Sequence, residues 1–435
     1  MKGEICKVSL KSSLYFAKSL IFPRTQKSTV ARKSLYGSII CIALSVVPLV
    51  SVLSITSGMI NGMTERLIGL SSGHLEVRVA KGLEETKSGE KFTAYAKNFE
   101  NISGITKAWP EVTLFALGVG KNMRSGAFLR GVSENIFEEN ESFKTLFEVK
   151  EGDTASLKKA SSVPYAIIGD KMAERLSLKT GELFRIITTK KAGEAVVPKV
   201  TTFKVGAVVS SGYQEMDELW IFIPLTAFFR SFPMANASFN ILLETEDAFS
   251  PSLVALQHKV KKSCGRFANV FRWDQVNAAR FENFSSTKVM LVFIMMMITF
   301  VASINISSAI VMLVMERRKE IAILKSVGAR PFEITLSFLL AALYCAAAGL
   351  LIGVPVGILL SVKANELIRF LEWFVNLFKE VQLMDPAYYL QTIPVAIPVN
   401  QIIMVVAGTL VLSVLVSVIP SVKAGKEKPS EGLKL

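Results

Sequence analysis

The chain has 435 residues, 51% of them hydrophobic, and a formal net charge of +14. Its mean hydropathy of +0.42 excludes an ordinary soluble globular protein and predicts an integral membrane protein with room for a soluble domain. Residues 1–34 hold eight Lys or Arg against one Glu, whereas residues 59–286 hold 29 basic against 26 acidic side chains. Half of the excess charge therefore lies in the N-terminal flank, which indicates membrane topology, and no nucleic-acid partner is expected.

Four apolar stretches are long enough to cross a hydrocarbon core of about 30 Å as helices. The predicted order is a cytoplasmic segment with an interfacial helix (1–34), transmembrane helix 1 (35–63), a large soluble domain (64–286), transmembrane helix 2 (287–315), a charged cytoplasmic helix (316–333), transmembrane helix 3 (334–362), a loop with an amphipathic helix (363–400), transmembrane helix 4 (401–420) and a cytoplasmic tail (421–435). Segments 1–34, 316–333 and 421–435 are net basic, which predicts that both termini are cytoplasmic.

Alternating apolar runs such as HLEVRV and LWIFIPL, separated by helical segments such as SLVALQHKVKKSC, predict an α+β domain between helices 1 and 2. With more than 200 residues, it can bury a core of its own. Cys264 is the only cysteine in this segment, so no disulfide is expected in the domain. His74 and His258, the two histidines, are far apart in sequence, and no metal site is predicted.

The charged segment after helix 2 is a second distinctive feature. It contains ERRKE and then IAILKSVG, which ends at Gly328, and Pro331 prevents the helix from continuing. We expect Ile321, Ile323, Leu324 and Val327 to share roughly one face. A simple connector needs only a few polar residues, so this helix is predicted to dock on a partner. The alternative is that its basic cluster is only the positive flank of a cytoplasmic loop.

Three further features lie in the later membrane segments. Helix 3 contains the small-residue run AALYCAAAGLLIGVPVG, which allows close helix packing. Residues 364–382 have the apolar spacing of an amphipathic helix, which we expect on the outer leaflet. Asn305 lies in the middle of helix 2, where an amide is expected to point into the bundle or a wet cavity. It is interpreted either as a helix–helix contact or as a polar contact that changes between nucleotide states.

The helix 2 motif SINISS, followed by ERRKEIAILKSVGA, resembles the coupling region of FtsX/MacB-type ABC-transporter permeases. The segments SGMINGMTERLIGLSSGHLEVRV and QVNAARFENFSSTKVML resemble the lipoprotein-releasing (Lol) permeases within that superfamily. The resemblance covers nearly the whole chain. It implies an inner-membrane permease with a MacB-like periplasmic domain, a cytoplasmic ABC ATPase dimer, a second permease copy or paralogue, membrane lipid, a lipoprotein substrate and a periplasmic lipoprotein carrier.

The resemblance also implies three sets of site residues. The ATPase-coupling set is Glu316, Arg317, Arg318, Lys319, Glu320, Ile321, Leu324 and Gly328. A substrate cavity between two permeases would be lined by Met59, Met63, Met295, Met296, Met297 and Asn305. A stretch at 188–203, which corresponds to a carrier-binding hairpin in one Lol subunit, keeps Lys190, Lys191, Pro198 and Lys199 as candidate carrier contacts.

The chain lacks the GxxxxGK[ST] phosphate loop and the HExxH motif. We therefore predict no catalytic residue and no cofactor in this chain, with ATP and Mg held by the partner ATPase. Two functions remain open. The chain is either a permease that extracts lipoproteins from the inner membrane for a periplasmic carrier, or a mechanotransmitting permease that drives a periplasmic enzyme or efflux partner.

Overall fold

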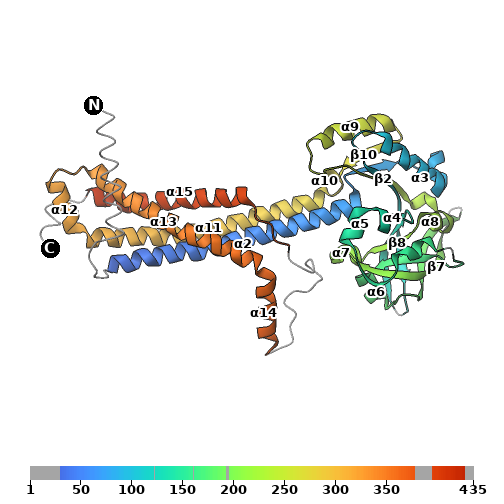
Figure 1. Cartoon of the computed structure of the whole chain (residues 1–435), viewed down its shortest axis with the longest axis horizontal. Helices are drawn as coiled ribbons and strands as arrows, with labels where there is room; N and C mark the ends of the chain where they lie inside the picture. Colours follow the sequence, from blue (N-terminus) through green and yellow to red (C-terminus); the bar gives the residue numbers. More distant parts are fainter. Residues whose placement is uncertain (1–29, 122, 160, 193–194, 378–393, 427–435) are drawn as a thin grey trace. The chain divides into compact units, whose positions relative to one another are not determined.

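The computed structural model describes residues 30–121, 123–159, 161–192, 195–377 and 394–426 (Figure 1). These residues form two compact units, one made of the membrane helices and the other spanning Ile60–Phe284. Most of the predicted N-terminal interfacial helix, residues 378–393 of the periplasmic loop and residues 427–435 of the tail lie outside the described residues.

In the part of the chain that the structure describes, four helices are long and apolar enough to cross a membrane, which confirms the predicted number. They are α2 (Val30–Leu67), α11 (Ala278–Glu316), α13 (Pro331–Val362) and α15 (Val399–Lys426). The short helix α12 (Arg318–Ser326) connects α11 to α13, and α14 (Ala364–Asn376) follows α13 (Figure 1).

The helices continue past the predicted segment borders at 63/64 and 286/287. Helix α2 continues to Leu67 and leads into the π-helix η1 (Ile68–Ser72), and α11 already begins at Ala278. Similarly, α15 extends to Lys426, beyond the predicted start of the tail. Hydropathy marks where a chain leaves the apolar layer, whereas a helix ends only where its backbone is capped, so the two borders differ.

A stripe of glycines joins α13 to α2. Cβ atoms added to Gly349, Gly353 and Gly357 would each lie 3.0 Å from a backbone carbonyl oxygen of α2. Ser51 Oγ also donates a hydrogen bond to Gly357 O at 3.0 Å. The two backbones therefore approach as closely as the small-residue run predicts.

The second unit contains one ten-stranded mixed sheet. Its strands are β1 (Leu75–Val79), β2 (Lys107–Val119), β3 (Arg124–Val132), β4 (Glu148–Gly152), β5 (Tyr165–Gly169), β6 (Leu183–Ala192), β7 (Ala195–Ser210), β8 (Trp220–Pro224), β9 (Ser238–Glu244) and β10 (Ala268–Arg272). The order is β10-β1-β9-β2-β3-β8-β5-β7-β4, and β6 pairs with β2 and β7. The first and last strands, β1 and β10, are antiparallel neighbours with Leu75 opposite Arg272.

Both faces of the sheet are covered. The helices are α3 (Gly89–Lys97), α4 (Ile136–Glu139), α5 (Glu141–Leu146), α6 (Asp170–Leu176), α7 (Gln214–Asp217), α8 (Leu225–Ser231), α9 (Ser252–Cys264) and α10 (Trp273–Val276); the 3₁₀ turns are η2 (Glu84–Lys87), η3 (Asn98–Asn101), η4 (Thr154–Lys158) and η5 (Met234–Asn236). Side chains of β5 alternate between two cores, with Ala166 and Ile168 in one and Ile167 in the other. The fold is thus a four-helix membrane protein with an α+β domain between helices 1 and 2, as predicted.

Candidate functional site

The charged segment forms a separate short helix between α11 and α13. Arg317 is the N-cap of α12 and pairs with Glu320. The helix ends at the C-cap Val327, and Gly328 follows with a φ of 105°, a conformation that favours glycine. Pro331 then occupies the first turn of α13. This arrangement agrees with the predicted helix end.

Helix α12 has two distinct apolar sides. Ile321 is 1% exposed and packs in the core of the membrane helices, and Ala322 is also buried. Ile323 and Val327 are 55% and 83% exposed. The predicted single apolar face is therefore corrected: Ile321 and Ile323 are two residues apart, or about 200° around a helix, so they point in nearly opposite directions.

The outward side forms a continuous stripe, which we call the coupling face. It consists of Lys319, Glu320, Ile323, Ser326 and Val327, all exposed and spaced as one side of a helix. Ile321 from the predicted coupling set instead fixes the helix to its own bundle. An apolar centre with charges beside it suits docking into a groove of another protein.

Lys325 joins α12 to the end of α15. Its Nζ donates a hydrogen bond to Gly425 O at 2.7 Å, where a cation favourably meets the C-terminal end of a helix. A Cβ on Gly425 would lie 2.7 Å from Pro331 O, so this position tolerates only glycine without movement. The sequence pattern did not reveal this contact, because its two residues are 100 positions apart.

An apolar cavity of about 400 Å³ lies among α2, α11 and α15. Its lining is Leu49, Leu53, Lys288, Val289, Val292, Met296, Thr299, Gln401, Met404, Val405, Gly408, Thr409 and Leu412. Its polar residues are Lys288 and Gln401, near the starts of the α11 and α15 spans, and Thr299 and Thr409 farther along these helices. The Oε1 atom of Gln401 is buried and has no hydrogen-bond partner among the described residues. Such a cavity has the size and chemistry for an apolar chain with a polar end.

Only Met296 of the predicted cavity residues lines this cavity. Met59, Met63 and Met295 are half-buried elsewhere, and Met297 is exposed. The side chain of Asn305 lies outside the described residues. This cavity lies within one chain, so the predicted cavity between two permeases stays a prediction. Leu49 and Met404 line the cavity within the chain without a sequence signal, because apolar residues in membrane helices do not reveal whether they face a cavity or lipid.

The end of α2 is anchored inside the soluble domain. Leu67 and Leu70 are fully buried in the second core. Arg130 Nη1 donates to Leu70 O at 2.6 Å, and Arg130 Nε pairs with the buried carboxylate of Glu111. The guanidinium also lies 4.3 Å from the ring centroid of Trp220. This buried pair fixes the π-helix to the sheet.

A second polar network holds the same helix end. Arg66 Nε donates to Ser211 O at 2.7 Å, and the Asp217 carboxylate accepts from Ser211 N at 2.8 Å. Burial raises the pKa of the Asp217 carboxyl to about 6. The chain around η1 therefore has polar as well as apolar anchors.

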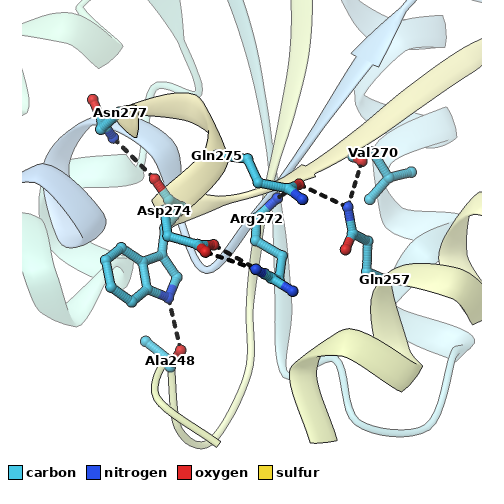
Figure 2. A network of polar contacts seen from close by, with 8 residues as sticks. Ala248, Gln257, Val270, Arg272, Asp274, Gln275 and Asn277 are labelled. Carbon is cyan, nitrogen blue, oxygen red and sulfur yellow. Dashed lines mark hydrogen bonds and ion pairs between the residues drawn. The ribbon is translucent and has the colours of Figure 1, made fainter. Parts of the chain in front are cut away.

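The segment that leads into α11, from β10 through α10, is held by the network in Figure 2. Trp273 Nε1 donates to Ala248 O at 2.8 Å, and Arg272 makes a two-point contact with Asp274 at 2.9 and 2.7 Å. The hydrogen bonds from Arg272 hold the pKa of Asp274 below its usual value. Gln257 Nε2 donates to Val270 O, which ties α9 to β10.

The candidate carrier contacts lie on the β6–β7 hairpin. Lys190 and Lys191 pair with Val197 and Val196 in its register. Thr189 pairs with Pro198, and Thr188 pairs with Lys199. The hairpin therefore gathers the four candidates near its tip, whose residues 193 and 194 lie outside the described ones.

The run GLSSG at 69–73 has the letters of the Gly-x-Ser-x-Gly nucleophile motif, with Ser71 in the nucleophile position. It lies mainly in the π-helix η1 rather than at a strand-to-helix turn. Ser71 is half-buried, and its neighbour Ser72 is buried, with its Oγ donating to Leu67 O or Gly73 O. We assign no catalysis to it.

Two family models match this architecture. The MacB-like periplasmic core domain matches residues 37–258, about half of the chain, and the FtsX-like permease C-terminal domain matches residues 292–429. The chain therefore belongs to the FtsX/MacB-type ABC-transporter permeases. This confirms the class that the coupling segment and the inserted domain indicate.

Similar proteins narrow the family further, to the lipoprotein-releasing permeases. The lipoprotein-releasing system transmembrane protein LolC of Neisseria meningitidis serogroup B is 26% identical over 405 residues, which cover 91% of this chain and 93% of that protein. LolC of Xylella fastidiosa (strain 9a5c) is 23% identical, with 92% and 93% covered. The LolE protein of Haemophilus influenzae is 22% identical, with 91% and 93% covered. The predicted resemblance to the Lol permeases is thus confirmed.

Proposed function

We propose that this chain is the permease subunit of an ABC transporter that extracts lipoproteins from the inner membrane and passes them to a periplasmic carrier. Similarity over 91% of the chain to a protein named for lipoprotein release carries the proposal. The chain itself is a non-catalytic multi-pass membrane subunit. ATP and Mg would bind to a cytoplasmic ATPase dimer, both chain termini would be cytoplasmic, and a second permease copy or paralogue would complete the complex.

In this proposal the coupling face of α12 docks on the ATPase. Movement of α12 would reach α15 through Lys325 and α13 through the turn at Pro331. The glycine stripe would pass movement of α13 to α2 because it leaves no free space between their backbones. The cavity lined by Met296 and Met404 would receive acyl chains, and the β6–β7 hairpin would contact the carrier.

A mechanotransmitting permease is the second candidate. The observation that favours it is the anchoring of Leu67, Leu70 and Arg130 in the domain core, which gives the end of α2 a stiff attachment. In that case the ATPase would move the periplasmic domain to drive an enzyme or efflux partner, and no lipoprotein would enter the cavity.

We predict that Ile323→Glu abolishes co-purification of the ATPase, with a loss of at least about tenfold. A charge without a partner in a docked interface costs several kcal/mol, while the 55% exposure of Ile323 means that the chain should still fold and insert. Ile323→Leu is the matched control and should retain the ATPase. Normal co-purification of the Ile323→Glu variant would show that α12 docks through another surface.

We also predict that a photoreactive residue at Met296, which lines the cavity, captures a tagged lipoprotein in membranes. The same residue at Leu351, which is 77% exposed on α13 and does not line the cavity, should capture only lipid. Capture at neither position, while the ATPase still co-purifies, would refute lipoprotein transport through this cavity and favour the mechanotransmitting role.

A further inference from the structure

Helix α14 (Ala364–Asn376) presents an unusual surface for a segment outside the four long helices. It follows the last residue of α13, Val362, after Lys363 alone, and Figure 1 shows it leaving the end of α13 at an angle. In the proposed topology α12 is cytoplasmic, so the end of α13 lies on the periplasmic side. The first turn of α14 therefore starts at the membrane boundary.

One side of α14 carries large, exposed apolar side chains. They are Leu367, Phe370, Leu371, Trp373, Phe374 and Leu377, with exposed fractions from 43% to 61%. At about 100° per residue they form one broad arc. The half-buried Ile368 and Val375 lie at one edge of this arc. We call the arc the aromatic face.

The polar side of α14 lies opposite and has a balanced charge. Arg369, Glu372 and Asn376 occupy it. Near the start of the helix, Lys363 Nζ pairs with Glu366 at 2.6 Å. Two basic residues, Lys363 and Arg369, therefore match two acidic ones, Glu366 and Glu372. Such a helix gains little from attraction to an anionic surface.

These observations favour lipid as the occupant of the aromatic face. The helix begins where a membrane span ends, Trp is enriched where acyl chains meet headgroups, and Trp, Phe and Leu are typical of the apolar face of interfacial helices. A helix with a broad apolar arc and an opposite polar side lies in the interfacial plane and is held mainly by buried apolar area. A water-exposed patch with three aromatic rings would be unusual for a surface without a partner.

We propose that α14 is a monotopic anchor inserted in the periplasmic leaflet, with its aromatic face among the acyl chains and with no requirement for anionic headgroups. Sequence periodicity predicts an amphipathic helix on the outer leaflet. The exposed arc and the balanced charge add the face that inserts and the force that holds the helix, which is the burial of apolar area. This anchor fixes the depth of α13 in the membrane and does not depend on which substrate the permease moves.

The test places a nitroxide label on the full chain in lipid nanodiscs. The label is attached at Leu371→Cys on the aromatic face or at Arg369→Cys on the polar side, with the native cysteines replaced by Ala. The label at 371 should be several-fold more accessible to dissolved oxygen than to a water-soluble nickel chelate, and the label at 369 should show the reverse. Both results should be the same in phosphatidylcholine alone, with added phosphatidylglycerol, and in high salt.

Two variants of the 371-labelled chain separate insertion from a folding defect. Phe370→Glu with Trp373→Glu should move the label into water and raise its nickel accessibility several-fold, while Asn376→Ser should leave it unchanged. Nickel accessibility at 371 equal to that at 369 in the parent would overturn the proposal, as would exclusion of both probes, which would indicate cover by a protein or a second copy. Insertion only with phosphatidylglycerol or at low salt would show that anionic headgroups hold the helix and would overturn an anchor held by apolar burial.

Discussion

Arg130→Met should lower the free energy of unfolding of the soluble domain by about 3–5 kcal/mol, because it leaves the Glu111 carboxylate buried without its partner. Arg130 and Glu111 are 1% and 3% exposed, so water cannot replace the lost contact. The change also removes the hydrogen bond to Leu70 O and the contact with the Trp220 ring. Denaturant unfolding of residues 60–284, followed by tryptophan fluorescence, measures the loss.

The matched control is the double variant Arg130→Met with Glu111→Met. It removes both charges, so it should be more stable than Arg130→Met alone, because no buried carboxylate remains unpaired. A loss below about 1 kcal/mol in the single variant would show that the pair contributes little and that the end of α2 is held by apolar packing alone.

Gly353→Leu should prevent normal packing of α2 against α13 and sharply reduce the amount of folded chain recovered in detergent. A Cβ at this position would already lie 3.0 Å from Ala43 O and 3.1 Å from Ala43 Cα, so a larger side chain must push two backbones apart. Overpacking of a core typically costs about 1–3 kcal/mol, and here backbone rather than a flexible side chain must move. Size-exclusion chromatography and thermal unfolding measure the effect.

Gly37→Leu is the control in the same helix pair, because nothing lies within 4 Å of a Cβ at Gly37. It adds the same side chain to a membrane helix without a clash and should be recovered like the parent. If Gly353→Leu behaves like Gly37→Leu, the close approach of α2 and α13 is not required for folding.

The sequence predicted those features that depend on composition over many residues. Apolar length located the four spans, alternation located the α+β domain, and Gly328 and Pro331 marked the end of the coupling segment. These signals are strong because each depends on residues that are close in sequence: on which side chains avoid water, or on which residues favour the end of a helix. The helix ends at Leu67 and Ala278 lie outside the predicted spans, because hydropathy does not report caps.

The sequence was less informative about contacts between distant residues. The Lys325–Gly425 hydrogen bond and the Arg130–Glu111 pair join segments whose proximity depends on the fold. The apolar face of α12 was assigned too broadly, because Ile321 and Ile323 look equivalent until the bundle buries one of them. Of the predicted methionines, only Met296 lines the cavity, since residue type alone does not determine which way a membrane residue points.

Strands β1 and β10, the first and last of the soluble domain, are neighbours in the sheet. The chain enters and leaves the soluble domain through neighbouring antiparallel strands, with Leu75 opposite Arg272 and Trp273 N donating to His74 O at 3.2 Å. Entry and exit thus occur at one place on the sheet. We therefore expect a domain exchanged between related permeases to need both junctions at this place, together with the segment around Leu67 and Leu70 that is buried in the domain core.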